Sequence, residues 1–248
     1  MKHFTTRTKH GVTTLVIAAA TMLTAGSCVS DNDDNYFNHP QSTNLVTYTG
    51  NETIVTDNPD NPGYVSTFTY YGVDNVVATS RTTYETRLPK DAAKPGQRMM
   101  ISYTLNNSNA TPYPSGVINL KSYRLIPTAQ VENALHEKAI ANNAEMPIYY
   151  IGNQPEISRT GNYINLQTRL RNYTEREFTI LADESTLSSD MPDLYISTTP
   201  KGTDTGIISV EMASFDITEV WRNPAINGVR IHINNTANDK QNIFEFKK

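Results

Sequence analysis

The triplet Asp204-Thr205-Gly206 is the spacing in this sequence that most resembles a catalytic device, because aspartic proteases carry their reactive carboxyl in such a triplet. Their chemistry needs two carboxyls that share one proton, and this chain has one copy of the triplet. The preceding residues, Pro200 to Thr203, are typical of a turn. The pattern therefore predicts a hairpin loop between strands at Leu194 to Thr199 and Ile207 to Ala213.

Two further acidic pairs, Asp183 with Glu184 and Asp190 with Asp193, lie in segments that resemble loops. A glycosidase needs two carboxyls placed across a sugar, which spacing along the chain does not establish. Solvated loops are the simpler interpretation. A glycan- or peptide-directed hydrolase with carboxylates at a domain junction stays open as the alternative. The segment Asp57 to Gly63 has the composition of a calcium loop, but prolines occupy its ligand positions.

Only three histidines lie beyond residue 27, namely His39, His136 and His232. No HExxH, GxSxG, P-loop or CxxC motif occurs with them. His232 alternates with Ile231 and Ile233, so it faces away from them and is interpreted as a surface or rim residue. We therefore predict no catalytic residue, no metal site and no cofactor, which favours a protein that is not an enzyme.

The residue with the largest binding surface is Trp221, the only tryptophan. It follows Phe215 and Ile217 in phase, which predicts an anchor in a core or at its rim. An exposed Trp221 beside Arg222 would instead stack on a glycan or on an aromatic residue of a protein partner.

The N-terminal segment has the three-part layout of a secretory signal peptide. Lys2, Arg7 and Lys9 precede a mostly apolar stretch that is shorter than the roughly 20 residues needed to span a bilayer. Ala25-Gly26-Ser27 then leads to Cys28, the only cysteine. We predict that residues 1–27 are a lipoprotein signal peptide and that Cys28 is the lipid attachment site, with palmitate among its acyl chains. Simple secretion would cut the same bond and leave an unpaired thiol.

Residues 28–42 are predicted to form an acidic, disordered tether. The run Val29 to Asn35 is polar and has no apolar period. Its acidic cluster directly after the cysteine resembles the surface-export signal of lipoproteins in Bacteroidetes. The expected location is therefore the outer membrane, lipid-anchored, at the cell surface. A solvated spacer with no address value is the alternative.

Composition excludes one class of partner. The chain has 248 residues and a net charge of −4, and the signal peptide would remove basic residues only. An acidic chain with no basic stripe repels phosphate backbones, so no nucleic-acid partner is expected. A single cysteine also excludes an internal disulfide, so hydrophobic burial must stabilise the fold.

The elements that must position all these residues are strands. Alternating apolar and polar residues recur in many short segments, which are separated by clusters rich in asparagine, proline and glycine. The fold class is therefore all-β. One helix is predicted over Thr128 to Asn143, from a weak apolar stripe. It separates two expected domains at residues 43–138 and 139–248.

Two segments resemble the NigD-like lipoproteins of Bacteroidetes. They are Lys94 to Arg98, which leads into a strand, and Gly161 to Leu166, which opens one in the second domain. The resemblance implies an N-terminal OB-like barrel at 43–138 and a C-terminal β-sandwich at 139–248. An OB-type domain could bind oligosaccharide on a strand face, where Tyr70 and Tyr103 are candidates.

The expected function is that of a non-enzymatic binding or interaction module, held to the membrane by its lipid anchor. A protein or a glycan is the expected partner, and contact through exposed loops is the expected mode. The alternatives are the hydrolase described above and a structural or immunity-like component of the envelope.

Overall fold

The computed structural model describes residues 42–56, 63–72, 76–105, 111, 113–143, 145–148, 150–151, 154–237 and 241–248. Most of these residues lie in strands, which confirms the all-β prediction. Within this described part, no helix is long and apolar enough to cross a membrane. The predicted signal peptide, Cys28, His39 and most of the tether lie outside the described residues.

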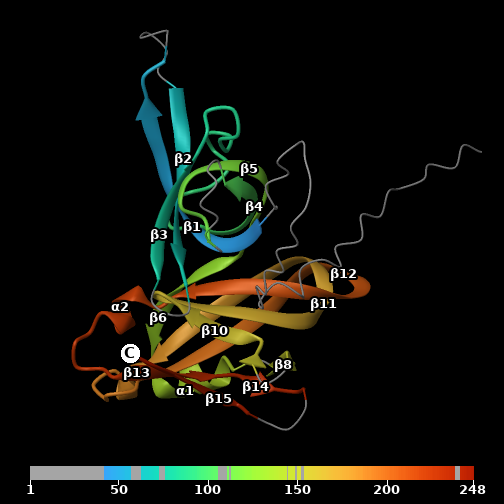
Figure 1. Cartoon of the computed structure of the whole chain (residues 1–248). Helices are drawn as coiled ribbons and strands as arrows, with labels where there is room; N and C mark the ends of the chain where they lie inside the picture. The colour runs from blue at the N-terminus through green and yellow to red at the C-terminus, as the bar shows by residue number, and fades with distance from the viewer. Residues whose placement is uncertain are drawn as a thin grey trace, which may run out of the picture. The chain divides into compact units, whose positions relative to one another are not determined.

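The first five strands form a closed barrel in the order β1-β2-β3-β5-β4 (Figure 1). They are β1 (Ser42–Ile54), β2 (Gly63–Tyr71), β3 (Val77–Thr82), β4 (Arg98–Leu105) and β5 (Gly116–Leu125). Strand β1 pairs antiparallel with both β2 and β4, and β3 pairs in parallel with β5. These pairings close the sheet on itself and confirm the OB-like barrel.

Alternation along the strands fills the barrel interior with apolar side chains. The buried cluster includes Val46, Phe68, Met99, Ile101, Tyr103 and Ile118. A closed sheet must bend, and the register of β1 against β2 shifts between Tyr48 and Gly50, where Gly50 has a φ of 130°. A glycine adopts that backbone conformation without the steric cost of a Cβ.

Two long antiparallel strands build the sandwich, namely β11 (Tyr163–Asp183) and β12 (Asp193–Asp216). The other members of its sheet are β6 (Thr128–Ala134), β10 (Ile157–Thr160), β13 (Gly228–His232) and β15 (Ile243–Lys247). Shorter elements are β7 (Glu145–Met146), β8 (Tyr150–Ile151), β9 (Gln154–Pro155), β14 (Asn234–Asn235), α1 (His136–Ala141), α2 (Thr218–Trp221) and a 3₁₀ turn at Glu184–Thr186.

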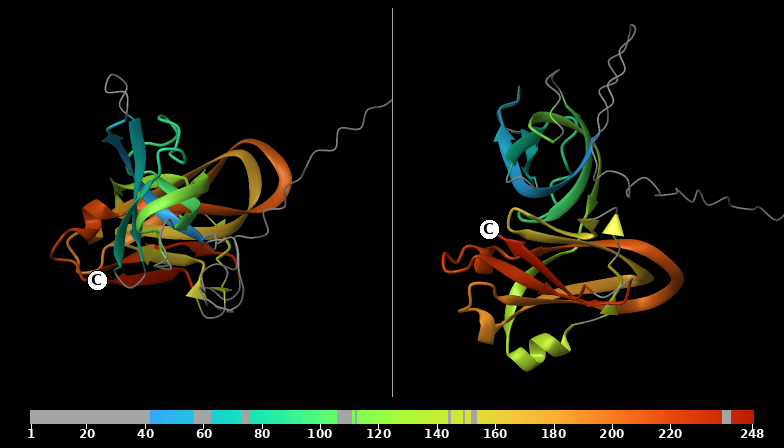
Figure 2. Two further views of the ribbon diagram at one scale, coloured as in Figure 1. Left: turned by 45° about the horizontal axis from the view of Figure 1, so that its top comes forward. Right: turned by 60° about the horizontal axis from the view of Figure 1, so that its bottom comes forward.

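Strands β11 and β12 curve together at mid-length, so each contributes to both layers of the sandwich (Figure 2). One layer holds β10, the first half of β11 and the second half of β12, and the other holds their remaining halves with β13 and β15. Strand β6 pairs in parallel with β12 at Ser214–Asp216 and with β11 at Ile180–Asp183. It therefore joins the two layers.

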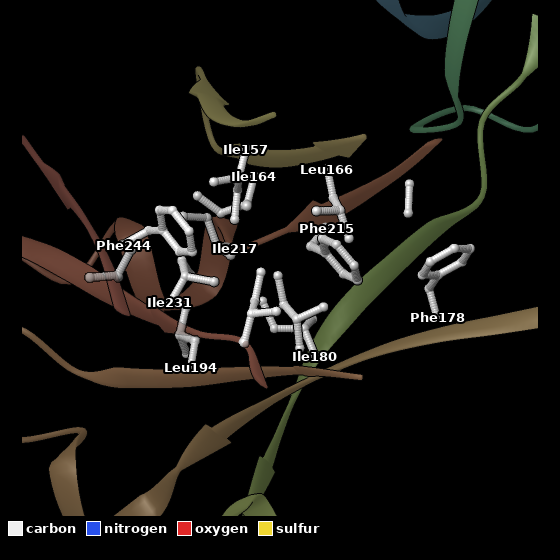
Figure 3. Packing of buried hydrophobic residues seen from close by; sticks show 14 of the residues in the cluster. Ile157, Ile164, Leu166, Phe178, Ile180, Leu194, Phe215, Ile217, Ile231 and Phe244 are labelled. Atoms are coloured by element: carbon white, nitrogen blue, oxygen red, sulfur yellow. The ribbon is translucent and has the colours of Figure 1, made fainter. Parts of the chain in front are cut away.

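The sandwich core lies between these layers (Figure 3). Alternate residues of β11 and β12 point inward, and β13 and β15 add Ile231 and Phe244. Phe178 and Phe215, from opposite layers, meet edge to face with ring centroids 6.4 Å apart.

The structure corrects the predicted helix over Thr128 to Asn143. Its first half is strand β6, and only His136–Ala141 is helical. Pairing with β11 and β12 satisfies the backbone hydrogen-bonding groups of Thr128–Ala134. This pairing outweighs the weak helical spacing of apolar residues in the segment. The chain therefore leaves the barrel after Leu125 and enters the second sheet at Thr128, earlier than the expected boundary after residue 138.

Candidate interaction surface

Strands β11 and β12 bend together at mid-length (Figure 2). The residues of β12 in this bend are the most exposed of the sandwich strands. The register between the two strands shifts from Arg171 to Tyr173 and again from Tyr173 to Glu175. On β12, Gly202 and Gly206 have φ values of 72° and 76°. Bulges and left-handed glycines turn a strand sharply, so this sequence bends the hairpin here.

Asp204 lies within this bend. The predicted loop between two separate strands is wrong, because β12 runs without interruption from Asp193 to Asp216 and Asp204 pairs with Tyr173. The Nε atom of Arg171 lies 2.6 Å from Oδ2 of Asp204, and the backbone N–H of Gly206 donates to Oδ1 at 2.8 Å. The Arg171 hydrogen bond, and then the Gly206 N–H, lower the pKa of Asp204. The partners of this carboxylate are a guanidinium and a backbone N–H, whereas a protease dyad pairs two carboxyls.

A second ion pair ties the two strands together on the same bend. Nζ of Lys201 lies 2.6 Å from Oε2 of Glu177, and that hydrogen bond raises the pKa of Lys201. Arg176 donates to the hydroxyl of Thr198 at 3.1 Å and to the carbonyl of Arg171 at 2.6 Å. The polar side chains of the bend are thus largely satisfied within the hairpin.

Three branched apolar side chains on β12 lack such cover. Ile207, Ile208 and Val210 are 62%, 72% and 41% exposed, and we refer to them as the hairpin strip. Ile208 pairs with Arg171 and Val210 with Arg169 across the ladder, so two basic side chains lie on the same face as those two residues.

The same sheet face continues to a buried polar site. Further along the strands, Ser214 pairs with Asn165 on this face, and both are buried. Asn165 accepts from Nη2 of Arg98, a residue of barrel strand β4, at 3.3 Å. Barrel residues thus cover one end of this face, and Ile208 and Val210 of the hairpin strip lie at its uncovered end, whereas Ile207 faces the other side.

Arg98 is a fully buried cation, although the sequence analysis named it only as the end of the segment that leads into a strand. Its Nη1 donates to Oγ1 of Thr47 at 3.0 Å, and its Nη2 also donates to Oγ1 of Thr160 at 3.2 Å. The guanidinium carbon lies 4.6 Å from the ring centroid of Tyr163. Burial lowers the pKa of Arg98 to about 10. Hydroxyls, an amide and an aromatic face therefore hold this cation.

Asp193 is another residue that the structure places differently from the prediction. It is buried rather than in a solvated loop, and its Oδ1 lies 2.7 Å from Nε2 of His232 and 3.4 Å from Nη1 of Arg230. The ring of Tyr195 stacks on His232 with centroids 4.4 Å apart. His232 is therefore part of a packed polar cluster on the sandwich surface.

Asp183 is also buried, whereas Glu184 and Asp190 are exposed as expected. Its Oδ2 lies 2.5 Å from Nδ1 of His136, and its Oδ1 accepts from the N–H and the hydroxyl of Ser185. Burial alone would raise the pKa of Asp183, but these partners more than reverse that effect and hold it below the ordinary value. Within the described residues, no group of three or more His, Cys, Asp or Glu side chains could hold a metal ion.

The three aromatic candidates, Trp221, Tyr103 and Tyr70, differ in how deeply they are buried. Trp221 lies in α2 rather than in a strand, packs partly buried against the sandwich core and has the guanidinium of Arg159 4.5 Å from its ring centroid. Tyr103 is fully buried inside the barrel and cannot contact a ligand, whereas Tyr70 is half-buried and stacks on Tyr113 at 5.6 Å. The core or rim anchor predicted for Trp221 agrees with this placement, and the guanidinium of Arg159 lies over its ring.

Comparison with known proteins establishes the fold. No family model and no curated protein match this sequence. A solved protein of unknown function, DUF1344 from Bacteroides vulgatus, is 13% identical with a TM-score of 0.58, covering 84% of this chain and 91% of that one. A NigD-like immunity protein from Bacteroides caccae is 14% identical with a TM-score of 0.49, covering 86% and 94%. At 13% identity, the similarity to the first of these structures is one of fold alone.

Proposed function

We propose that this protein is a lipid-anchored module of the outer membrane, displayed at the cell surface, that binds a protein partner through the hairpin strip. The observation that carries the proposal is the exposure of Ile207, Ile208 and Val210 on one short stretch of β12. Single exposed apolar residues are common on protein surfaces, but a cluster of branched ones favours a contact surface.

The chemistry of the strip favours a protein over a small molecule. Ile208 and Val210 lie on the face of β12 opposite to its core residues Ala213 and Phe215, so they point away from the sandwich core. Arg169 and Arg171 flank Ile208 and Val210 on the sheet face. Arginine and apolar side chains together are typical of the centre of protein interfaces.

The carboxylates support binding rather than hydrolysis. A general acid in a hydrolase needs a raised pKa, so that it is protonated near neutral pH. Asp204 and Asp183 have lowered pKa values, set by Arg171 and by His136 with Ser185. These two residues stay ionised, and each holds a structural contact.

Photo-crosslinking on intact cells tests the contact. A photoreactive amino acid at position 208 should capture one discrete partner, and the same group at Lys121, an exposed position on β5, should capture none. Ile208→Asp should abolish capture from a probe at position 210 and change the free energy of unfolding by less than about 0.5 kcal/mol, as for ordinary surface changes. Equal capture from positions 208 and 121 would overturn the proposal.

Protease treatment of intact cells tests the location. The sequence features that support it are the N-terminal signal pattern, Cys28 and the acidic run after it. We expect the mature chain to be digested while a periplasmic control protein survives, and we expect Cys28→Ser to release the chain from membranes. Full protection in cells whose control is also intact would place the protein inside the envelope.

A further inference from the structure

The hairpin strip lies on a strand with one open edge. Along one side β12 pairs with β11, and the two strands arch out together from the sandwich (Figure 2). The other side of β12 pairs with β13 at Asp193–Tyr195 and with β6 at Ser214–Asp216. Between these two stretches, no strand of the described part of the chain pairs with that side. An unpaired edge with exposed apolar side chains is a template for a further strand.

The direction of the backbone groups shows which residues of β12 offer hydrogen bonds at the open edge. The N–H of Ser214 donates to the carbonyl of Pro127, just before β6, so it points away from β11. The pairing of β12 with β11 is regular from Ile208 to Asp216, and the direction alternates along a regular strand. Ile208, Val210 and Met212 therefore point their N–H and C=O groups to the open edge.

The usable part of this edge is short and has a defined centre. Gly206 has a φ of 76°, which turns the chain out of an extended path. At Ser214 the edge is already occupied by β6. Val210 is the midpoint of these two limits. A second copy of the same edge, running antiparallel, therefore fits with Val210 opposite Val210 of that copy, which is the arrangement a twofold axis produces.

In this register every exposed residue of the hairpin strip lies opposite an apolar residue. On one face of the sheet, Ile208 lies opposite Met212 of the second copy, and the two Val210 side chains lie side by side. On the other face, Ile207 lies opposite Ala213, a residue of the sandwich core. Edge pairing thus covers Ile207 as well as Ile208, although these two neighbours face opposite sides of the strand.

The polar residues of the stretch agree with the same register. Ser209 lies opposite Glu211 of the second copy, and within one chain the hydroxyl of Ser209 already donates to Oε1 of Glu211 at 2.8 Å. Glu211 is the only charged residue from Ile207 to Ala213, so no like charges are directly opposed. A shift of two residues one way sets Glu211 opposite Ile207, and a shift the other way meets β6 at Ser214.

We infer that the partner of the hairpin strip is a second copy of this chain, which pairs antiparallel with the first along the open edge of β12. The inference rests on the binding role proposed above and names the partner. Ile208, Val210 and Met212 each exchange two hydrogen bonds with the opposite residue, so about six backbone hydrogen bonds join the copies. A contact of this length is at the small end of specific interfaces, so we expect a Kd of about 10–100 μM.

Disulfide trapping tests the register. Cys28 is the only cysteine, so the chain from residue 28 onward with Cys28→Ser is a cysteine-free background. Opposed residues of a hydrogen-bonded antiparallel pair have Cα atoms about 5.5 Å apart, which suits a disulfide. Val210→Cys should therefore give at least tenfold more linked dimer on mild oxidation than Ser209→Cys, whose two copies lie more than about 7 Å apart. Lys121→Cys, exposed on β5, is the control and should give no more than Ser209→Cys.

A charge exchange at position 210 tests the association itself by analytical ultracentrifugation. Val210→Lys and Val210→Glu each set two like charges opposite each other, and each should raise the Kd of the dimer at least tenfold. An equimolar mixture of the two variants should associate at least tenfold more tightly than either variant alone. Because Val210 is 41% exposed, both variants should unfold at the same urea concentration as the original chain.

The inference is overturned if the original chain sediments as a monomer at about 1 mM, well above the expected Kd. It is also overturned if Ser209→Cys is trapped as readily as Val210→Cys, or if mixing Val210→Lys with Val210→Glu restores no association. Photo-crosslinking from position 208 separates this failure from that of the proposed function. A product of two copies of the chain supports both, capture of a different protein leaves only the binding role, and no capture removes both.

Discussion

Replacing Arg98 with methionine should lower the free energy of unfolding by only about 1–2 kcal/mol, although Arg98 is fully buried and its side chain makes three hydrogen bonds. Methionine keeps most of the length of the side chain and removes its charge. The expectation follows from two opposing contributions at this site.

The first contribution is the burial of the charge. The pKa of Arg98 falls from 12.5 to about 10. Each pKa unit corresponds to 1.36 kcal/mol, so folding disfavours the protonated form by about 3 kcal/mol. The second is the loss of hydrogen bonds from a charged donor, each contributing about 1.5–3 kcal/mol. The acceptors keep other partners, because Asn165 donates to Thr160 at 2.8 Å and Ser214 donates to Asn165 at 2.8 Å. At the lower figure the three bonds sum to about 4.5 kcal/mol. Removing the charge returns about 3 kcal/mol of this, so a net cost of about 1–2 kcal/mol is left.

Replacing Arg98 with alanine or lysine should give results that differ from the methionine variant. Arg98→Ala also removes the apolar part of the side chain and leaves a cavity, so it should cost about 3 kcal/mol, as large-to-small core changes do. Arg98→Lys buries a more strongly hydrated charge with fewer donors and should also destabilise. Urea unfolding followed by fluorescence of Trp221, the only tryptophan, measures all three variants. A cost for methionine equal to that for alanine would refute the reasoning, because it would mean that relief of the charge burial offsets none of the lost hydrogen bonding.

Three further outcomes are expected. Because the pKa of Asp183 is lowered in the folded protein, its carboxylate adds to the free energy of unfolding above the ordinary pKa of 3.8, and this contribution is lost as the pH falls through the lower folded value. Asp183→Asn should therefore flatten the decline of the free energy of unfolding below about pH 4. Gly161→Ala should cost at least about 1–2 kcal/mol in urea unfolding, because Gly161 has a φ of 56° and a Cβ would lie 2.7 Å from Cδ1 of Tyr71; no loss would contradict that packing. Phe215→Ala should lower stability by about 3–5 kcal/mol, whereas Ile208→Ala should change it by less than about 0.5 kcal/mol, and equal effects would mean that Ile208 is not exposed.

The sequence predicted the two architectures well because alternation is a local signal. Each inward residue of the barrel and of the sandwich is next to an outward one in the chain, so the strands are readable without knowing their partners. Strand β6 was misassigned because the pairing that makes it a strand comes from β11 and β12, far along the chain. Local propensity carries no information about that pairing.

The polar residues were less predictable for a related reason. Asp183 and Asp193 appeared solvated because the residues that satisfy them, His136 and His232, are distant in sequence. Arg98 belonged to a recognised segment, yet only the fold shows that it is buried against Asn165. The hairpin strip lies in the segment Ile207 to Ala213, which was predicted as a strand, and the exposure of its apolar side chains could not be inferred from their apolar character.

The strand order also constrains the sequence in which the protein can fold. The barrel uses only residues up to Leu125, so it can close once the first half of the chain is available. The sandwich cannot be completed until much later, because β6 must wait for partners that end at Asp216 and the outer strand β15 ends at Lys247. During that interval Thr128–Ala134 is an unpaired strand directly attached to a finished domain. Its polar residues Gln130, Glu132 and Asn133 disfavour aggregation of the strand before its partners have formed. This accounts for a segment that joins two sheet layers being less apolar than the strands it joins.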